Sequence, residues 1–390
     1  MISSSANTEF FFTFGDNNTG EYIPPSTPKT HAEIEATIPL ARFPWYTLSG
    51  DVLESWLSCY PLASSSPVQP PRHESTTHHT RKMGRKKKDS TEAGSTDLSI
   101  GPKPSPLSLE LQTSEKGVYT LYYQTALDLR NLVGCLSSPG EGSAGCGKGG
   151  NGHGGTPGEL RDIIPGRYYG GLKVWSCAPD LARYVVSLGA LWHNAARVFG
   201  REVSSLVFAE VGCGQALPAM AAIAIGARTL ILQDYNKEVL ERCVKSNLGA
   251  TITGNAQFCP LFYEKESVAV KEVRVQLAHG DWAKLGWSDP FGNGTKADNA
   301  CVAGCDVVLG SDVTFDHDSC WKLSQLLQRW LRPITGVAFI ATKMYYFGTN
   351  GGSLEFEQCA SRFGLTTEKV ANMDEEGGMR RVILKVRKEK

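Results

Sequence analysis

The chain lacks the features that mark secreted and membrane-spanning proteins. None of its 390 residues belongs to an uncharged apolar run of about eighteen residues, which predicts that no helix spans a membrane. The first residues, MISSSANTEFFFTFGDNN, have neither a basic start nor a long apolar core, so we expect no secretory signal. Basic and acidic residues balance at 40 each, which gives no global argument for binding to nucleic acid or to an acidic surface.

A regular cysteine pattern is also missing. The 11 cysteines are odd in number and scattered along the chain. Cys301 and Cys305 form one close pair, but no second pair with histidines completes a zinc pattern. The simplest interpretation is a reduced, intracellular protein without a structural metal.

The N-terminal third has little apolar periodicity. Residues 1–115 are rich in Ser, Thr and Pro, which predicts a mostly disordered region. Within it, residues 38–57 (IPLARFPWYTLSGDVLESWL) are apolar enough for a docking segment, a local helix or a piece packed loosely on the main domain. Residues 81–88 (RKMGRKKK) form a basic cluster, typical of a nuclear address, of weak contact with RNA or of a solvated charge run.

A partly ordered extension is expected at residues 116–159. It begins with the pattern of a strand followed by a helix start, across residues 115–132. The glycine-rich stretch 137–158 resembles a phosphate loop only superficially, because no strand precedes it, no helix follows it and no hydroxyl residue follows Lys148. We interpret it as a flexible insertion.

Strands and helices alternate through the main domain, residues 160–390. Strands are expected at 206–211, 229–234, 273–278, 306–310 and 335–342, with two closing strands near 366–370 and 380–387. Helices are expected at 180–198, 216–226, 237–248, 319–331 and 353–363. This alternation predicts an α/β fold, a mostly parallel sheet with helices on both faces, whose last strand is reached by a hairpin.

The turn after the first of these strands predicts a cofactor site. The strand runs into Gly212-Cys213-Gly214, a small-residue helix follows, and the next strand ends in Asp234, 20 residues after Gly214. Such a turn holds an adenosine-containing cofactor against backbone amides, and the acid can reach ribose hydroxyls.

Two features of the sequence favour S-adenosylmethionine over a nicotinamide dinucleotide. A dinucleotide turn needs a third small residue where this chain has Leu217. Asp281-Trp282, after the third strand, offers a carboxylate for an exocyclic amine and a ring to stack on adenine. The alternative interpretation of this pair is a capping Asp and a core Trp.

Six sequence blocks follow one another in residues 160–388. They are PGRY at 165–168, GGLKVWSC at 170–177, QDYN at 233–236, GDW at 280–282, SDVT at 311–314 and KMYYFGTNGG at 343–352. In these blocks and in their order the chain resembles the protein-histidine methyltransferases, specifically the group that acts on ribosomal proteins.

The resemblance implies a class I methyltransferase, with a Rossmann-like, seven-stranded, mostly parallel sheet and S-adenosylmethionine as the cofactor. It implies transfer of a methyl group to the tele nitrogen of a histidine in large-subunit ribosomal protein three. Carried over residue by residue, the expected cofactor-binding residues are Val174, Trp175, Ser176, Cys177, Ala178, Gly212, Gly214, Gln233, Asp234, Tyr235, Gly280, Asp281, Trp282 and Ser311.

The chain departs from the family pattern at two acids. Ser176 replaces a glutamate, and Asp312 stands where the family has the longer glutamate. We expect Asp312 to hold the substrate imidazole in its reactive tautomer by accepting its other N–H, with Tyr346, or its neighbour Tyr345, beside it. His317 is taken as an incidental loop histidine, and no metal is expected.

Two rival functions remain open on the sequence. A related group methylates lysine on translation factors or chaperones and shares the glycine turn. A cofactor-binding scaffold or chaperone without turnover is the other, because the carboxylate at position 176 is lost. We expect the substrate to be a protein, and we expect no binding to a membrane and no contact with nucleic acid beyond a weak one by the basic cluster. The protein is expected to be a monomer located in the cytoplasm and in the nucleus or nucleolus.

Overall fold

A computed structural model describes eight stretches of the chain: residues 38–58, 107–113, 117–124, 163–164, 166–255, 273–287, 304–373 and 378–389. All belong to one compact unit, Ile38–Lys390. Several predictions lie outside these residues, and they concern residues 1–37, the basic cluster at 81–88, the loop at 137–158 and Cys301.

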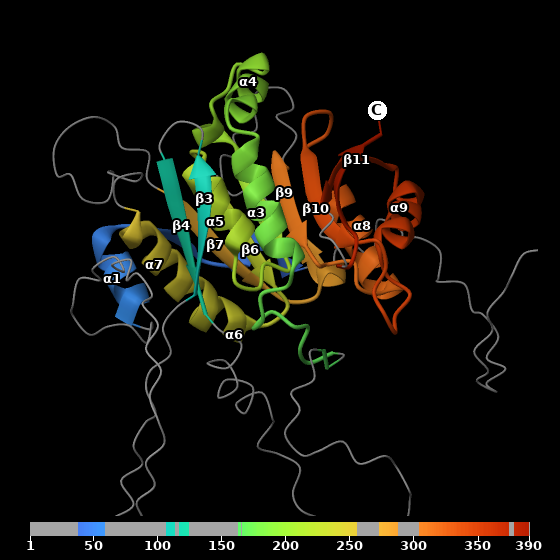
Figure 1. The fold of residues 1–390 in the computed structure, drawn as a ribbon, viewed down its shortest axis with the longest axis horizontal. Helices are drawn as coiled ribbons and strands as arrows, with labels where there is room; N and C mark the ends of the chain where they lie inside the picture. Colours follow the sequence, from blue (N-terminus) through green and yellow to red (C-terminus); the bar gives the residue numbers. More distant parts are fainter. Residues whose placement is uncertain are drawn as a thin grey trace, which may run out of the picture. The chain divides into compact units, whose positions relative to one another are not determined.

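The centre of this unit is an eight-stranded sheet with the order β11-β12-β10-β9-β5-β6-β7-β2. Figure 1 labels several of these strands, namely β6, β7, β9, β10 and β11. The five strands from β10 to β7 run parallel, whereas β12 is antiparallel to both of its neighbours and β2 is antiparallel to β7. The strands are β2 (Trp45–Thr47), β5 (Val207–Val211), β6 (Thr229–Asp234), β7 (Arg274–His279), β9 (Val307–Ser311), β10 (Val337–Lys343), β11 (Leu365–Met373) and β12 (Arg381–Lys388).

Helices cover both faces of the sheet. They are α1 (Gly50–Ser58), α3 (Cys177–Ser187), α4 (Ala190–Val198), α5 (Leu217–Ala224), α6 (Lys237–Val239), α7 (Lys245–Gly254), α8 (His317–Trp330) and α9 (Ser353–Arg362). Because side chains alternate along a strand, Phe208 packs in the core beneath α3, α5 and α7, whereas Ala209 packs in the core beneath α8 and α9. The predicted α/β fold, a mostly parallel sheet with helices on both faces, is therefore confirmed, and β2 adds an eighth strand to the seven that were expected.

The sequence prediction was wrong about one helix. The helix expected at 180–198 is two helices, α3 and α4, and α3 begins earlier, at Cys177. Gly189 separates them with a φ of 40°, a value that glycine adopts readily and that the regular helix does not allow. The apolar spacing crosses the break, so periodicity alone did not reveal it.

The apolar segment at 38–57 is part of the main fold. It forms β1 (Ile38–Pro39), β2 and α1, and the side-chain amide of Gln276 donates to the carbonyls of Leu40 and Phe43 at 2.8 and 2.9 Å. Residues 38–58 are thus an ordered part of the region 1–115, which was predicted to be mostly disordered. Burial holds this segment in place, because Leu48, Leu53 and Trp56 enter the core shared with α7.

A hairpin precedes the domain. Strand β3 (Leu107–Thr113) pairs with β4 (Gly117–Tyr123), and Tyr119 and Leu121 are buried in the same core. The backbone of Thr120 donates to the Asn255 side chain at 2.9 Å. The short β8 (Leu285–Gly286) pairs with β1. Among the described residues, no helix has both the length and the apolar character to cross a membrane.

Candidate active site

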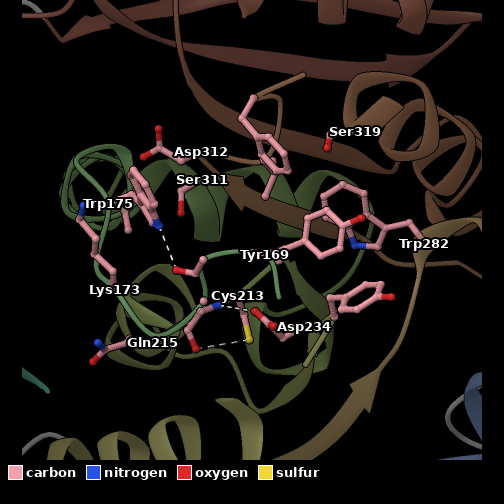
Figure 2. Close-up of a pocket in the computed structure, with 18 of the residues that line it drawn as sticks. Tyr169, Lys173, Trp175, Cys213, Gln215, Asp234, Trp282, Ser311, Asp312 and Ser319 are labelled. Carbon is pink, nitrogen blue, oxygen red and sulfur yellow. Dashed lines mark hydrogen bonds between the residues drawn. The ribbon is translucent and has the colours of Figure 1, made fainter. Parts of the chain in front are cut away.

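A cavity of about 850 Å³, including its open mouth, lies at the carboxyl ends of the central strands. This edge is where open parallel sheets bind ligands. Most of the residues predicted from the sequence line it, as Figure 2 shows in part. They are Val174, Trp175, Ala178, Gly212, Gly214, Asp234, Tyr235, Gly280, Asp281, Trp282, Ser311 and Asp312.

Four predicted residues are not part of the cavity lining, namely Ser176, Cys177, Gln233 and Tyr346. Sequence reasoning also missed part of the lining. Tyr169 and Phe315 form aromatic contacts at the mouth, with ring centroids 6.2 Å apart, and Asp318, Ser319 and Lys322 come from the start of α8. The three α8 residues could have been predicted from the position of their helix, because α8 starts directly after the carboxyl end of β9, where ligands bind.

The glycine turn is shaped by two left-handed residues. Gly212 has a φ of 58° and Gly214 a φ of 50°, a region that side chains disfavour. A Cβ on Gly212 would lie 2.7 Å from Cγ1 of Val313, and a Cβ on Gly214 would lie 3.2 Å from the carbonyl oxygen of Gly171. Both positions therefore require glycine, and their bare backbone forms the cavity floor.

Asp234 is tied to this turn. One carboxylate oxygen accepts the backbone N–H of Gly214 at 2.9 Å, and the other accepts that of Asn236 at 3.0 Å. Burial raises the pKa of Asp234 to about 6, against the opposing effect of these backbone hydrogen bonds. A carboxylate has about four acceptor positions, so the side chain can still accept a hydroxyl group from a ligand in the cavity.

Gln233 holds three loops together from behind the cavity wall. Its side-chain oxygen accepts from the Gly212 N–H at 3.1 Å and from the Trp282 indole N–H at 2.6 Å, and its amide donates to the Gly280 carbonyl at 2.9 Å. The side chain is fully buried. Gln233 thus positions the glycine turn and the Trp282 ring, and it does not itself line the cavity.

The sequence allowed two interpretations of Asp281 and Trp282, a cofactor-binding pair or a capping Asp and a core Trp, and the structure has features of both. Asp281 caps a short 3₁₀ turn by accepting the Ala283 N–H at 2.9 Å, and its other oxygen pairs with Lys322 Nζ at 3.0 Å. Both Asp281 and Trp282 nevertheless line the cavity. The cap fixes the loop, and the loop presents the Trp282 ring to the site.

Asp312 lies at the end of β9 and is held from three sides. Oδ2 accepts the N–H of Cys177, the first residue of α3, at 2.9 Å. Oδ1 accepts the Tyr346 hydroxyl at 3.0 Å and lies 3.2 Å from Lys343 Nζ. Its φ of 54° is a strained value for a residue with a side chain. The carboxylate is therefore fixed at the cavity wall, and its negative charge suits the start of a helix.

Trp175 forms part of the wall beside Asp312. Its indole N–H donates to the Gly170 carbonyl at 3.0 Å, and the ammonium groups of Lys173 and Lys343 lie 4.4 and 5.3 Å from its ring centroid. These contacts fix the ring plane. Ser176 is exposed and supplies no carboxylate at this place.

Glu210 is buried at the end of β5, close to the turn. One oxygen accepts the N–H of Ala219 in the first turn of α5 at 2.8 Å, whereas the other has no partner among the described residues. Burial raises the pKa of this carboxyl well above its usual range. Because Glu210 does not line the cavity, its contact anchors α5 beneath the glycine turn.

Comparison with known proteins agrees with the motif resemblance. Curated proteins named histidine protein methyltransferase 1 homolog match from Dictyostelium discoideum, 28% identical over 200 residues (50% of this chain, 50% of that protein), and from Rattus norvegicus, 28% over 222 residues (55% and 56%). Histidine protein methyltransferase 1 of Schizosaccharomyces pombe is 26% identical over 216 residues (50% and 58%). The similarity to this family is thus confirmed, and the chain spans about half the length of these relatives.

Two further comparisons carry less information. No protein-family model matches the chain. Among solved structures, magnesium protoporphyrin IX methyltransferase from Synechocystis with bound S-adenosylmethionine has a TM-score of 0.33 at 13% identity, covering 55% of this chain and 85% of that one. A structure described as a putative RNA methyltransferase from Pyrococcus horikoshii has a TM-score of 0.32 at 14% identity, covering 56% and 87%.

Proposed function

We propose that this chain is an S-adenosylmethionine-dependent protein methyltransferase whose acceptor is a histidine imidazole. One observation carries the proposal. Residues from separate sequence blocks, at 174–175, 178, 212–214, 234–235, 280–282 and 311–312, line a single cavity at the carboxyl edge of the sheet. All of these except 178 and 212–214 belong to the motifs that carry the resemblance to histidine protein methyltransferases.

The residues present fit the cofactor. Gly212 and Gly214 leave backbone where a side chain would intrude, which suits the methionine part. Asp234 is the acceptor for ribose hydroxyls, and the Asp281 and Trp282 pair suits the adenine ring and its amine. When bound, the cofactor supplies a methyl group that its sulfonium already activates for transfer.

The acceptor needs little chemical help. A neutral imidazole is a nucleophile near pH 7, so the main task is to hold the ring in line and in the correct tautomer. A carboxylate offers about four acceptor sites. Asp312 uses three of them, for Cys177, Tyr346 and Lys343, which leaves one for the N–H of a substrate imidazole.

Tyr346 acts through Asp312. Its hydroxyl donates to the carboxylate from behind the cavity wall, and its ring lies 4.9 Å from Lys343 Nζ. It is therefore a positioning residue. Lys343 Nζ pairs with Oδ1 of Asp312, and a carboxylate only accepts hydrogen bonds, as the tautomer argument requires.

The finer target is a histidine of large-subunit ribosomal protein three, methylated at the tele nitrogen. What supports this target is the motif resemblance to the group directed at ribosomal proteins. A ribosomal client would bring the enzyme into both cytoplasm and nucleus, because ribosomal proteins pass through both.

The proposal is tested by incubating the full chain with cell extract and S-adenosylmethionine carrying a labelled methyl group. After acid hydrolysis of the protein fraction, amino-acid analysis should recover the label as methylhistidine. Label recovered as methyllysine would favour the lysine-directed alternative. Cofactor binding without any label would favour a scaffold.

A further inference from the structure

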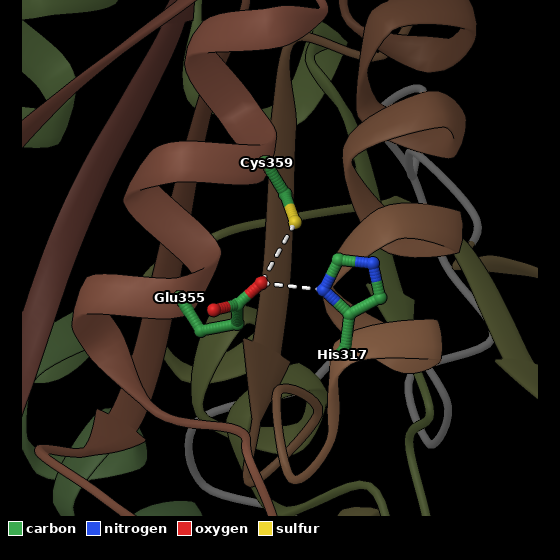
Figure 3. Close-up of side chains that lie close together, drawn as sticks. All are labelled: His317, Glu355 and Cys359. Carbon is green, nitrogen blue, oxygen red and sulfur yellow. Dashed lines mark hydrogen bonds and ion pairs between the residues drawn. The ribbon is translucent and has the colours of Figure 1, made fainter. Parts of the chain in front are cut away.

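We propose that His317, Glu355 and Cys359 form a zinc-binding site between α8 and α9 (Figure 3). The imidazole, carboxylate and thiol ligand atoms all lie within 4.8 Å of one another. The site is separate from the cavity, because none of the three side chains lines it. It also departs from the sequence expectation that no metal is present and that His317 is incidental.

The local sequence brings the three groups together. Glu355 and Cys359 are four residues apart on α9, so they lie on one face of that helix. His317 is the first residue of α8 and faces them, because its Nδ1 lies 2.5 Å from Oε1 of Glu355. The backbone N–H of His317 donates to the side-chain oxygen of Asn350 at 3.1 Å, which fixes the start of α8 against the loop before α9.

Two hydrogen-bond partners converge on one carboxylate oxygen. Oε1 of Glu355 contacts His317 Nδ1 and also lies 3.6 Å from Sγ of Cys359. In a tetrahedral zinc site, neighbouring nitrogen, oxygen and sulfur ligands are about 3.3–3.6 Å apart, given metal–ligand bonds of about 2.0–2.3 Å. Small side-chain shifts therefore suffice for one cation to replace the hydrogens that these groups now share.

The donor set selects the metal. Thiolate, imidazole and carboxylate together suit zinc, whereas magnesium and calcium take oxygen ligands. On binding, Cys359 loses its thiol proton to solvent as the zinc–sulfur bond forms. The Nδ1 lone pair of His317 forms the second bond, with the ring proton on Nε2, and Glu355 contributes an oxygen. Three protein ligands leave a fourth position for water.

The surroundings suit a fixed metal centre. Cys359 is buried, and the His317 ring stacks on Trp321 with centroids 6.2 Å apart. Trp321 in turn packs edge-on against Phe363 at 4.8 Å. Aromatic packing of this kind holds a ligand ring in place. A bound ion would join α8, whose first turn lines the cavity, to α9.

The test uses the full chain, stripped with chelator, and titrates it with zinc and with cobalt(II) as a spectroscopic substitute. The expected result is one ion per chain, a thiolate-to-cobalt charge-transfer band, and a higher melting temperature with zinc. Cys359→Ser should abolish the band and weaken binding by about 100-fold or more, a loss at or above that seen for altered metal surroundings. His317→Gln, which keeps the thiol, should weaken binding similarly.

Cys305→Ser is the matched control. Cys305 is also a buried free thiol, but it contacts Trp330 at the far end of α8, roughly 20 Å from His317 by helix length. This variant should keep the band and the affinity. Absence of a thiolate band in the parent chain would overturn the proposal, as would an unchanged band in Cys359→Ser. Neither result depends on methyl transfer, so failure here is distinct from failure of the proposed function.

Discussion

The carboxylate of Asp234 accepts the backbone N–H of Gly214 at 2.9 Å. This bond joins the end of β6 to the glycine turn after β5. Asp234 therefore has two tasks, because it fixes the turn through its hydrogen bonds and faces the cavity as an acceptor for ribose hydroxyls. The site is preorganised through one side chain.

Replacing Asp234 with alanine should abolish most cofactor binding. The change removes a charged acceptor for two backbone N–H groups as well as for the ligand, and each charged hydrogen bond contributes about 1.5–3 kcal/mol. We expect the affinity for S-adenosylmethionine, measured by calorimetry, to fall by about 100-fold or more. Asp318→Ala, which removes an exposed acid at the cavity mouth, is the control and should change affinity by only a few-fold. Retained affinity in Asp234→Ala would contradict the ribose assignment.

Cofactor binding should weaken in mild acid. Burial raises the pKa of Asp234 to about 6, and only the ionised form accepts hydrogen bonds with both oxygens. As pH falls below this value, the binding-competent fraction falls, so the affinity should be about tenfold lower at pH 5 than at pH 7. Asp234→Asn, which does not titrate, gives the baseline for titration of the ligand itself. Identical pH profiles for the two proteins would show that Asp234 is not the group responsible.

Gly212→Ala should damage the site beyond the ordinary cost of its backbone conformation. The added Cβ would lie 2.7 Å from Val313, and such overpacking costs about 1–3 kcal/mol. Gly200→Ala is the matched control, because Gly200 also has a positive φ, 65°, but nothing lies within 4 Å of an added Cβ. Thermal melting and calorimetry should show a larger loss of stability for Gly212→Ala, and a loss of cofactor affinity in that variant alone. Equal effects of the two changes would argue against a crowded turn.

Two adjacent tyrosines allow a paired test of the acceptor side. Tyr346→Phe removes the hydroxyl that donates to Asp312, whereas Tyr345 is 51% exposed and its change to Phe should be neutral. We expect Tyr346→Phe to lower kcat by about tenfold, equivalent to about 1.4 kcal/mol, with little change in cofactor affinity. If both variants behave alike, the proposed positioning of Asp312 by Tyr346 is wrong.

Much of the fold was predictable because apolar runs and turn residues in the sequence mark the same strands and turns that the structure contains. Buried parallel strands such as β5 and β6 are short apolar runs bounded by turn residues, and the glycine turn sits where backbone geometry requires it. The break at Gly189 and the docking of residues 38–58 were not predictable in this way. Both depend on tertiary contacts, because an apolar pattern does not specify which surface it will cover.

The site was predictable at its backbone turns and less so at its side chains. Gly212, Gly214 and Asp234 were predictable because the sequence has a strand, a glycine turn, a helix and then a second strand that ends in an acid. Gln233 belongs to the predicted QDYN motif, but its side-chain amide hydrogen-bonds to the loops behind the cavity wall. Only the hydrogen bonds of the structure show this role. Lys322 reaches the cavity from α8, and its sequence signal is only the position of that helix after the carboxyl end of β9.

The most direct test of the central claim locates the transferred methyl group on its acceptor atom. Large ribosomal subunits lacking the modification would be incubated with the full chain and S-adenosylmethionine carrying a deuterated methyl group, then digested and analysed by tandem mass spectrometry. The account predicts a heavy methyl group on the tele nitrogen of a histidine in ribosomal protein three, absent with Asp234→Ala. A heavy methyl group on lysine, or none under conditions where calorimetry shows bound cofactor, would contradict it.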